Sequence, residues 1–391
     1  MIARLARFSV RWWWAVILTW AVIAVALWAA APPFEEVATF DETAFLQPDA
    51  APIKGGRLLA EGWPRDNFTR TAALVLARED EELTDADRAY AEDVISWLRS
   101  DGAPDAFGDV TTHLDDQDLE SVLLADDGQA MIVLVGLEVP PFTPPANEAI
   151  HDTREYLDDT QHPDGLTVEL TGSAAVAADE SAAIDRSVNS THLITIVLVV
   201  VILLFVFRSP VAPLVPLATI ATAFVVALGT VSLLAEGGME VSSLYETFSI
   251  VIVFGAGTDY CLFLLARYNE ELDLGEEHGF EVNGRTRRRT LVVTLFVLIA
   301  VLGSSAFTTI AGFTSMSVAE FGMFRTMGPA MAIAVAITLT AALTLAPALM
   351  RLFGKWLFWP DLSMAGEHGG DAPLLRTHAD RFGFDDPETS T

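Results

Sequence analysis

The sequence predicts an α-helical polytopic membrane protein: six transmembrane helices, with one extracytoplasmic α+β domain between helices 1 and 2. Two observations predict this class. The 391-residue chain is 52% hydrophobic, with a mean hydropathy of +0.39, yet its net charge is −30. The charge is concentrated in residues 32–190, which hold 35 Asp and Glu against 9 Lys and Arg. Most of the remaining chain consists of apolar runs long enough to cross a bilayer.

The composition also argues against several kinds of partner. Only two lysines occur, Lys54 and Lys355. An acidic, lysine-poor surface is typical of halophilic proteins, although a codon bias towards arginine explains the pattern equally well. No basic patch faces the acidic domain, so nucleic-acid binding is not expected. The single cysteine, Cys261, lies in an apolar run, which argues against disulfides in the acidic domain. Neither a metal cluster nor an organic cofactor site is predicted.

The first predicted element, residues 1–31, is a basic N-terminus followed by an apolar run from Trp12 to Ala31. A basic flank and a run that ends in small residues also describe a cleavable signal peptide. The apolar run of about 20 residues is long enough to span the bilayer, which favours an uncleaved first helix.

Residues 32–190 are predicted to form the acidic domain. The predicted strands are Thr71–Ala77, Asp109–His113, Ala130–Leu137 and Leu166–Thr171, and the predicted helices are Thr84–Arg99, Asp115–Leu124 and Pro145–Thr160. This βαβ-βαβ order predicts a ferredoxin-like, porter-type fold. Glycosylation sequons occur at Asn67 and Asn189, but chance matches to this motif are common.

Residues 191–355 are predicted to hold the other five transmembrane helices, followed by a polar cytoplasmic tail, 356–391, that is disordered from Asp361. The predicted spans are His192–Phe207, Ala212–Ala235, Phe248–Ala266, Leu291–Ala311 and Met327–Leu352, with a charged loop at Arg267–Arg289. The basic residues predict the orientation in the cell membrane, because Lys and Arg concentrate in cytoplasmic segments. With the N-terminus inside, the short outer loops hold only Arg325, so both termini are expected in the cytoplasm and the acidic domain outside.

The first candidate functional residue is Asp259, which follows Gly255 and Gly257 in an otherwise apolar run. An Asp at a helix centre costs roughly 2.5–3.5 kcal/mol on insertion scales. Asp259 lies eight residues before Arg267, or about 12 Å along a helix, which is near the middle of the membrane. Such an acid carries protons, or it is a structural Asp held by hydroxyl groups between helices. Tyr260 beside it has a hydroxyl that can donate to a carboxylate on a facing half-unit.

Two further groups accompany the acid. Small and hydroxylated residues in the fifth span either support the proton path or serve helix packing; they include Gly303, Ser304, Ser305, Thr308, Thr309 and Gly312. A basic run before that span is a topology signal and a contact for anionic lipid headgroups; its arginines are Arg285, Arg287, Arg288 and Arg289.

Several motifs resemble one half-unit of the resistance-nodulation-division (RND) superfamily, in its mycobacterial membrane protein large (MMPL) branch. They are Arg208-Ser-Pro-Val-Ala-Pro-Leu214, Gly255-Ala-Gly-Thr-Asp-Tyr260, Leu264-Leu-Ala-Arg-Tyr-Asn-Glu-Glu271 and Pro347-Ala-Leu-Met-Arg-Leu-Phe-Gly-Lys355. The resemblance covers roughly residues 1 to 360. It implies a secondary transporter, not an enzyme, that exports lipids or other hydrophobic compounds in exchange for protons. It also implies that Asp259 and Tyr260 relay those protons.

The chain departs from the family pattern because it carries one Asp-Tyr pair, whereas the usual transporter has two halves. A second half-unit is therefore expected, either as another copy or as the rest of a longer chain. Two alternatives stay open: a non-transporting scaffold or lipid sensor, and a protein-export accessory similar to SecD and SecF. The sequence leaves the substrate undetermined, and it leaves sodium open as the coupling ion.

Overall fold

The computed structural model of the chain describes residues 9–39, 45–47, 49–62, 70–79, 81–115, 117–207, 209–277, 284–357 and 359. The chain divides into two compact units: unit 1 comprises Met1–Thr39 and Leu193–Thr391, and unit 2 comprises Phe40–His192. Several residues used for prediction lie outside the described ones, namely Arg4, Arg7, Asn67, Arg208 and the tail from Asp361. The side chains of Asn189 and Lys355 also lie outside them.

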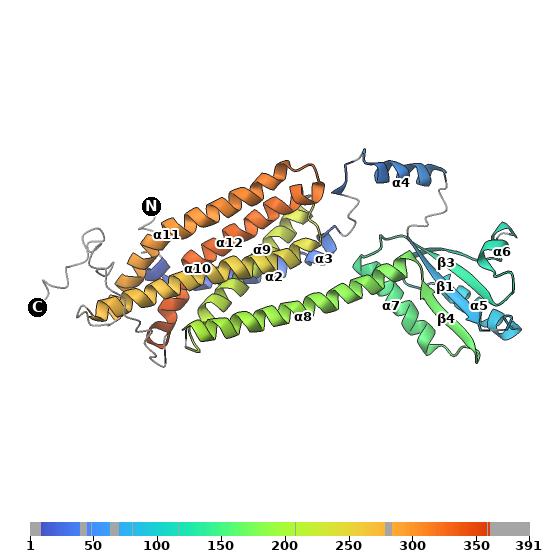
Figure 1. The fold of residues 1–391 in the computed structure, drawn as a ribbon, viewed down its shortest axis with the longest axis horizontal. Helices are drawn as coiled ribbons and strands as arrows, with labels where there is room; N and C mark the ends of the chain where they lie inside the picture. The colour runs from blue at the N-terminus through green and yellow to red at the C-terminus, as the bar shows by residue number, and fades with distance from the viewer. Residues whose placement is uncertain are drawn as a thin grey trace, which may run out of the picture. The chain divides into compact units, whose positions relative to one another are not determined.

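Unit 2 contains a four-stranded antiparallel sheet with the strand order β2-β3-β1-β4 (Figure 1). The strands are β1 (Thr71–Arg78), β2 (Phe107–Thr111), β3 (Ala130–Leu137) and β4 (Leu166–Thr171). The helices are α4 (Ala51–Gly62), α5 (Asp85–Leu98), α6 (Gln117–Leu123) and α7 (Pro144–Asp159). The predictions for β3 and β4 are confirmed to the residue, whereas β2 begins and ends two residues earlier than predicted.

One face of the sheet forms the core of unit 2. In β1 and β3 every second side chain is buried, as period-2 alternation requires when a single face is covered. Leu74 of β1 and Val133 of β3 are paired in the ladder and both are fully buried. They belong to one cluster with Tyr90 and Val94 of α5 and Ile150 of α7. Helices α5 and α7 therefore close the apolar face of the sheet.

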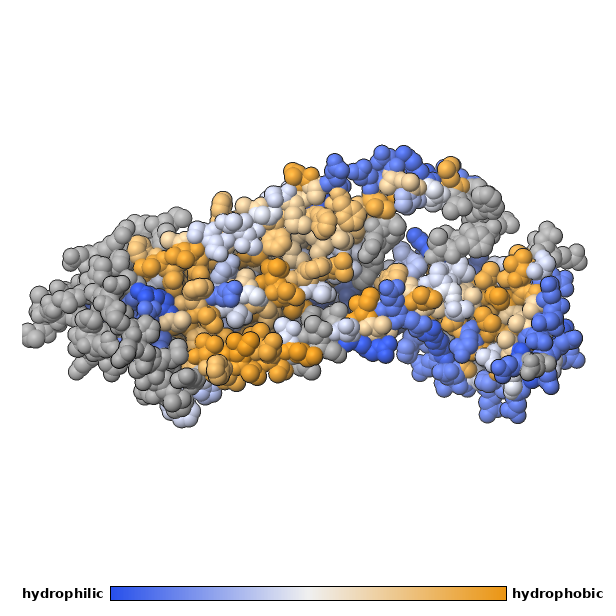
Figure 2. Space-filling model, viewed as in Figure 1, coloured by the Kyte–Doolittle hydropathy of each residue, from blue (hydrophilic) through white to orange (hydrophobic). Residues whose placement is uncertain are grey.

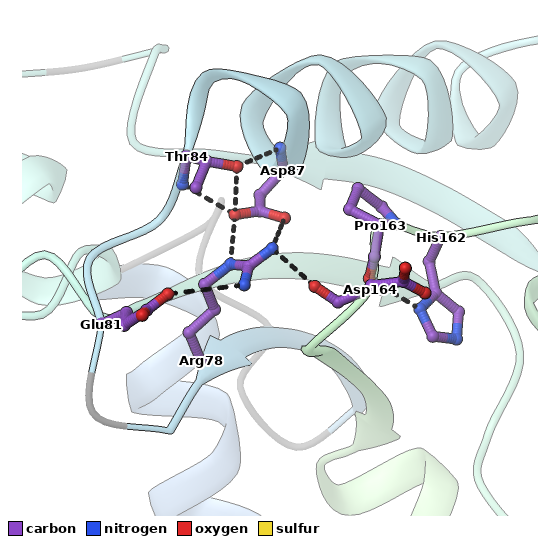
Figure 3. Close-up of polar contacts among 7 residues, drawn as sticks. All are labelled: Arg78, Glu81, Thr84, Asp87, His162, Pro163 and Asp164. Atoms are coloured by element: carbon purple, nitrogen blue, oxygen red, sulfur yellow. Dashed lines mark hydrogen bonds and ion pairs between the residues drawn. The ribbon is translucent and has the colours of Figure 1, made fainter.

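A buried acid ties this sheet to α5 (Figure 3). Asp87, whose side chain is 1% exposed, accepts two hydrogen bonds from Arg78, at 2.6 Å from Nε and 3.0 Å from Nη2. It also accepts from the backbone N–H of Thr84 at 2.7 Å, which completes a capping box at the start of α5. Arg78 donates further to the carbonyl oxygen of Asp164 at 3.0 Å. The hydrogen bond from Arg78 is the main reason that the pKa of Asp87 is lowered to about 2.

Unit 1 is a bundle of long helices, and five of them are long and apolar enough to cross a membrane by length and composition. These helices are α2 (Trp13–Ala30), α9 (Leu214–Glu236), α10 (Leu244–Glu277), α11 (Gly284–Ser315) and α12 (Gly322–Phe353). The short helix α3 (Phe34–Val37) follows α2. Hydrophobic residues dominate the surface of this unit in Figure 2, whereas the surface of unit 2 is largely hydrophilic. The bundle is therefore suited to a lipid environment.

Two sequence predictions about the helices differ from the structure. The predicted span His192–Phe207 is the end of one continuous helix, α8 (Ser173–Phe207), and its apolar part, Ile194–Phe207, is shorter than the other five candidate spans. The predicted charged loop at Arg267–Arg289 is too long, because α10 continues to Glu277 and α11 begins at Gly284. Ion pairs one turn apart explain the extension of α10: Arg267 contacts Glu270 at 2.6 Å and Glu271 at 2.7 Å.

Helix α12 is the centre of the bundle, since it contacts α2, α9, α10 and α11. Glycine allows α10 to approach closely: a Cβ on Gly257 would lie 2.7 Å from Cγ1 of Ile220 in α9 and 3.2 Å from Cγ2 of Thr338 in α12. A hydrogen bond of 3.0 Å from Trp20 Nε1 to Thr344 Oγ1 joins α2 to α12. Close backbone approach and a few polar contacts therefore hold α12 against its neighbours.

The turn after α8 is fixed by Ser209, a residue of the Arg-Ser-Pro motif. Its buried hydroxyl lies 2.9 Å from the carbonyl oxygens of both Leu357 and Trp359, and it accepts from the backbone N–H of Val211 at 3.2 Å. The motif thus connects the start of α9 to the segment after α12. Its role in the described structure is to hold two chain segments together.

Candidate functional site

Asp259 lies on the side of α10 that points away from the helix bundle. The residues exposed on this helix follow one stripe at helical spacing, and they include Phe248, Val251, Gly255, Asp259 and Phe263. Among the residues that the structure describes, none makes a hydrogen bond or an ion pair with the Asp259 carboxylate. A structural Asp would be hydrogen-bonded to hydroxyl groups between helices. The described residues provide no such bond to the Asp259 carboxylate.

Tyr260 points in a different direction, because successive residues of an α-helix are about 100° apart. Its side chain is 6% exposed and packs with Cys261, Leu264 and Val335 in the main core cluster of unit 1. The phenol still interacts electrostatically with Asp259. Asp259 is therefore the exposed member of the pair and Tyr260 the buried one, and donation by Tyr260 to a facing half-unit stays a prediction.

The two glycines of this segment serve different surfaces. Gly257 is buried and provides the close contact with α9 and α12 described above. Gly255 is exposed, and a Cβ built on it would have no heavy atom within 4 Å. Gly257 is thus required for packing inside this unit. Gly255 leaves a flat surface one turn from Asp259, which nothing described in this chain occupies.

The hydroxylated stripe of α11 also faces away from the core. Ser304, Ser305, Thr308 and Thr309 are exposed. Ser304 donates to the carbonyl oxygen of Val301 at 2.8 Å, and Thr308 and Thr309 donate to carbonyl oxygens four residues back at 3.1 and 3.2 Å. The hydroxyls of Ser304, Thr308 and Thr309 are therefore satisfied within their own helix, so they tolerate an apolar environment.

The stripe on α11 is offset from Asp259 along the bundle. Helices α10 and α11 contact each other, and the Tyr268 hydroxyl lies 3.5 Å from the carbonyl oxygen of Arg287. At 1.5 Å per residue from this level, Asp259 is about 14 Å along α10 and Ser304 about 26 Å along α11. The two polar groups are therefore about 12 Å apart along the bundle. Ser304, Ser305 and Thr308 are therefore not direct partners of Asp259.

One group of possible metal ligands did not stand out in the sequence. His151, Asp152 and Glu155 lie within one turn of α7, and one ligand atom from each lies within 4.8 Å of the others. All three residues are exposed. Such groups are common on acidic surfaces, and no buried polar atom points to an ion here, so the group defines no site.

Fold and site together define a multi-pass membrane protein with an α+β unit inserted between α2 and α9 and an exposed carboxylate on an apolar face of α10, unpaired among the described residues. Residues 44–370 match the family model described as "MMPL family". Since this match covers most of the chain, the protein belongs to the MMPL family, as its motifs predicted.

Comparison with curated proteins gives mycobacterial and streptomycete relatives. The chain is 31% identical over 352 residues to the probable transport protein MmpL12 of Mycobacterium tuberculosis, an alignment that covers 90% of this chain and 30% of that protein. The sulfolipid-1 exporter MmpL8 of the same species is 28% identical, with 90% and 31% covered. A putative membrane protein of Streptomyces coelicolor is 30% identical, with 88% and 39% covered. The chain thus spans about a third of the length of these relatives.

Proposed function

We propose that the chain is one half-unit of a secondary transporter that exports lipids or other hydrophobic compounds, driven by protons that move through Asp259. The observation that carries this proposal is the exposed carboxylate of Asp259 in the middle of an apolar helix. Family membership supports it, as do relatives named as transport proteins, one of them a sulfolipid-1 exporter. No enzymatic activity is part of the proposal.

The physical basis is the cost of a charge in hydrocarbon. An Asp at a helix centre costs roughly 2.5–3.5 kcal/mol on insertion scales, and the neutral, protonated carboxyl costs less than the charged carboxylate. Proton binding therefore changes the relative free energies of helix arrangements that expose Asp259 to different surroundings. A sodium ion neutralises the charge in the same way, so the coupling ion is tested by varying both ions.

A second half-unit is part of the proposal. The exposed stripe through Gly255 and Asp259 offers a flat surface for a neighbouring helix, and small residues favour such contacts. The relatives are more than twice as long as this chain, since the alignments cover only 30% and 39% of them, which leaves room for another half. The partner is either a second copy or the rest of a longer chain. In this arrangement Asp259 faces the partner, and Tyr260 acts from inside its own bundle.

The proposed topology has six transmembrane helices, with the apolar part of α8 as the second. Both termini lie in the cytoplasm and the acidic unit 2 lies outside. The arginines support this orientation because Arg267, Arg287 and Arg351 are at the same end of the bundle and Arg325 is at the other. The strand order of unit 2, with α5 and α7 as crossovers, supports a ferredoxin-like domain.

Transport of a fluorescent lipid tests this function. The full chain is reconstituted into liposomes, and movement of a headgroup-labelled phosphatidylethanolamine is followed after a pH gradient is imposed. We expect Asp259→Asn to abolish gradient-driven movement. Glu240→Gln is the matched control, because it removes an exposed carboxylate from the loop between α9 and α10. We expect the Glu240→Gln protein to transport normally.

The alternatives predict other results in the same assay. Equal lipid movement by Asp259→Asn and the unchanged chain would refute the proton path. A scaffold or lipid sensor predicts no gradient-driven movement by either protein. Replacing the proton gradient with a sodium gradient distinguishes the two coupling ions.

A further inference from the structure

A cavity of about 460 Å³ lies at the end of unit 1 where α2 begins and α12 ends. Arginines from two helices line it: Arg287 and Arg288 from the first turns of α11, and Arg351 from the last turn of α12. The cavity lies within the usual size range of small-molecule sites. Three guanidinium groups around one hollow call for a physical explanation.

The charges in this cavity are not balanced by described carboxylates. The described lining residues include no Asp or Glu, and none of the three arginines forms an ion pair with a described acid. Arg351 is half-buried, and its Nε has no hydrogen-bond partner among the described residues. Arg287 donates one long hydrogen bond, 3.4 Å, to the carbonyl oxygen of Gly354. Most of the donors of the cluster are therefore available to a ligand.

The cluster cannot reduce its own repulsion by losing protons, because arginine stays charged in proteins. Arg288 and Arg351 are close enough to interact electrostatically. Like charges beside one another at the edge of an apolar bundle, one of them on the half-buried Arg351, raise its free energy unless an anion lies between them. Gly284, the first residue of α11, also lines the cavity, so the positive end of the helix dipole adds to the attraction.

The rest of the lining indicates the chemistry of that anion. Guanidinium groups form bidentate hydrogen bonds with phosphate oxygens. The walls of the cavity are apolar and aromatic, formed by Trp13, Tyr268, Leu291 and Met350. Tyr268, Leu291 and Met350 are buried parts of the bundle, and Trp13 is the first residue of α2. A charged mouth with apolar walls fits a phosphate group attached to a less polar remainder.

We propose that this cavity is a binding site for a phosphate ester, either the headgroup of an anionic phospholipid or a soluble phosphate ester. Of the four arginines in the basic run that were predicted to contact lipid headgroups, only Arg287 and Arg288 line this cavity. The site adds Arg351 from α12, which sequence reasoning did not single out. Arg285 and Arg289 are not among the lining residues. The inference does not depend on proton transport through Asp259.

Native mass spectrometry of the full chain tests this site. The protein is purified from bilayers containing equal amounts of phosphatidylglycerol and phosphatidylcholine with identical acyl chains, and the retained lipids are counted. We expect preferential retention of phosphatidylglycerol. Arg351→Gln should reduce that preference roughly tenfold, the equivalent of one charge-assisted contact. Arg288→Gln, at an exposed position that folding tolerates, should reduce it in the same direction.

Two controls separate the pocket from general basic charge. Arg285→Gln removes a charge from the same run outside the lining, and Arg325→Gln removes one from the opposite end of α12. Both variants should keep the preference of the unchanged chain. Equal loss in all four variants would overturn the site in favour of diffuse attraction. Unchanged preference in Arg351→Gln and Arg288→Gln, together with unchanged phosphate binding in the second measurement, would also overturn it.

A second measurement distinguishes the two sources of phosphate. Binding of glycerol 3-phosphate and of inorganic phosphate to delipidated protein in neutral detergent is measured by calorimetry. Binding of glycerol 3-phosphate that is lost in Arg351→Gln identifies a soluble ester. Lipid preference without binding of either soluble anion identifies the phospholipid headgroup. Absence of both effects would refute the site.

Discussion

The two units of this protein can be compared through one acid in each, Asp87 in unit 2 and Asp259 in unit 1, which differ in burial and in hydrogen-bond partners. Asp87 of unit 2 is buried, yet it accepts hydrogen bonds from Arg78 and Thr84 that satisfy both of its oxygens. Asp259 of unit 1 is exposed on an apolar helix, and no described residue pairs with it. A fully partnered buried acid serves the fold. An unpartnered acid facing lipid or a second protein costs stability, which indicates that it is retained for function.

Glycines show the same contrast between inner and outer surfaces within unit 1. Gly257 lies where α10 packs against α9 and α12, whereas Gly255 faces open space. The inner surface of α10 at Gly257 is covered by residues of this chain. The outer surface around Asp259 is left open by the described residues, and in our proposal a second half-unit covers it.

The largest stability effect is expected in unit 2. Asp87→Asn removes the charge that pairs with Arg78, a residue whose side chain is only 12% exposed, and we expect a loss of about 3 kcal/mol. Hydrogen exchange of the β1 and α5 amides in the full chain measures this loss. Asp115→Asn is the matched control: its partner Arg99 is 44% exposed, so the loss should stay below about 1 kcal/mol. Equal losses in the two variants would contradict the structural role of Asp87.

The pH dependence of unit 2 follows from the same ion pair. The pKa of Asp87 is lowered to about 2, mainly by the hydrogen bond from Arg78, from an ordinary value of about 3.9. The pair therefore stabilises the folded unit fully above about pH 4. This contribution, about 2.6 kcal/mol, is lost as the pH falls through about 2. Acid titration of the unchanged chain by hydrogen exchange should show this loss, and Asp87→Asn should show a flatter profile.

The two glycines give a test within one turn of α10. Gly257→Ala places a methyl group 2.7 Å from Ile220, so we expect a loss of about 1–3 kcal/mol in thermal unfolding of the full chain in detergent. Gly255→Ala meets no described atom and should leave unfolding unchanged or raise stability by up to about 1 kcal/mol. Association of two half-units should weaken in Gly255→Ala, as measured by cross-linking in membranes. A destabilised Gly255→Ala chain that still associates would contradict the assignment of inner and outer surfaces.

The smallest effect concerns the Arg-Ser-Pro turn. Ser209→Ala removes a buried hydroxyl that bonds to the carbonyl oxygen of Leu357, and we expect a loss of about 1 kcal/mol in thermal unfolding. Ser304→Ala is the control, because the Ser304 hydroxyl is exposed and bonds only within its own helix. Equal stability of Ser209→Ala and Ser304→Ala would show that the motif does not stabilise the turn.

The sequence predicted the strands of unit 2 and helices α5, α6 and α7 because their patterns are local, but it missed α4. Short apolar runs mark β1 and β3, and Thr84 with Asp87 marks the start of α5. It also identified the apolar helices and the acid at position 259. The end of α10 was missed because Arg267 stabilises the helix there through ion pairs with Glu270 and Glu271, about one turn away. The start of α11 at Gly284 was missed as well.

Contacts between distant segments could not be predicted in this way. Nothing local shows that Tyr260 turns into the core while Asp259 turns out, since this depends on how α10 is rotated against α12. Arg351 joins Arg287 only because the last turn of α12 packs beside the first turns of α11. Ser304 and Thr308 lie on the helix that follows the one with Asp259, but their positions along the helix axis keep their hydroxyls away from Asp259.

The most direct test of the central claim compares function and stability in one preparation of Asp259→Asn. Proton entry into liposomes is followed with a trapped pH-sensitive dye, and thermal unfolding is recorded on the same protein. We predict that Asp259→Asn loses proton entry while its unfolding temperature stays at or above that of the unchanged chain. Proton entry at the normal rate, or a chain that unfolds because the acid is gone, would show that Asp259 is a structural residue like Asp87.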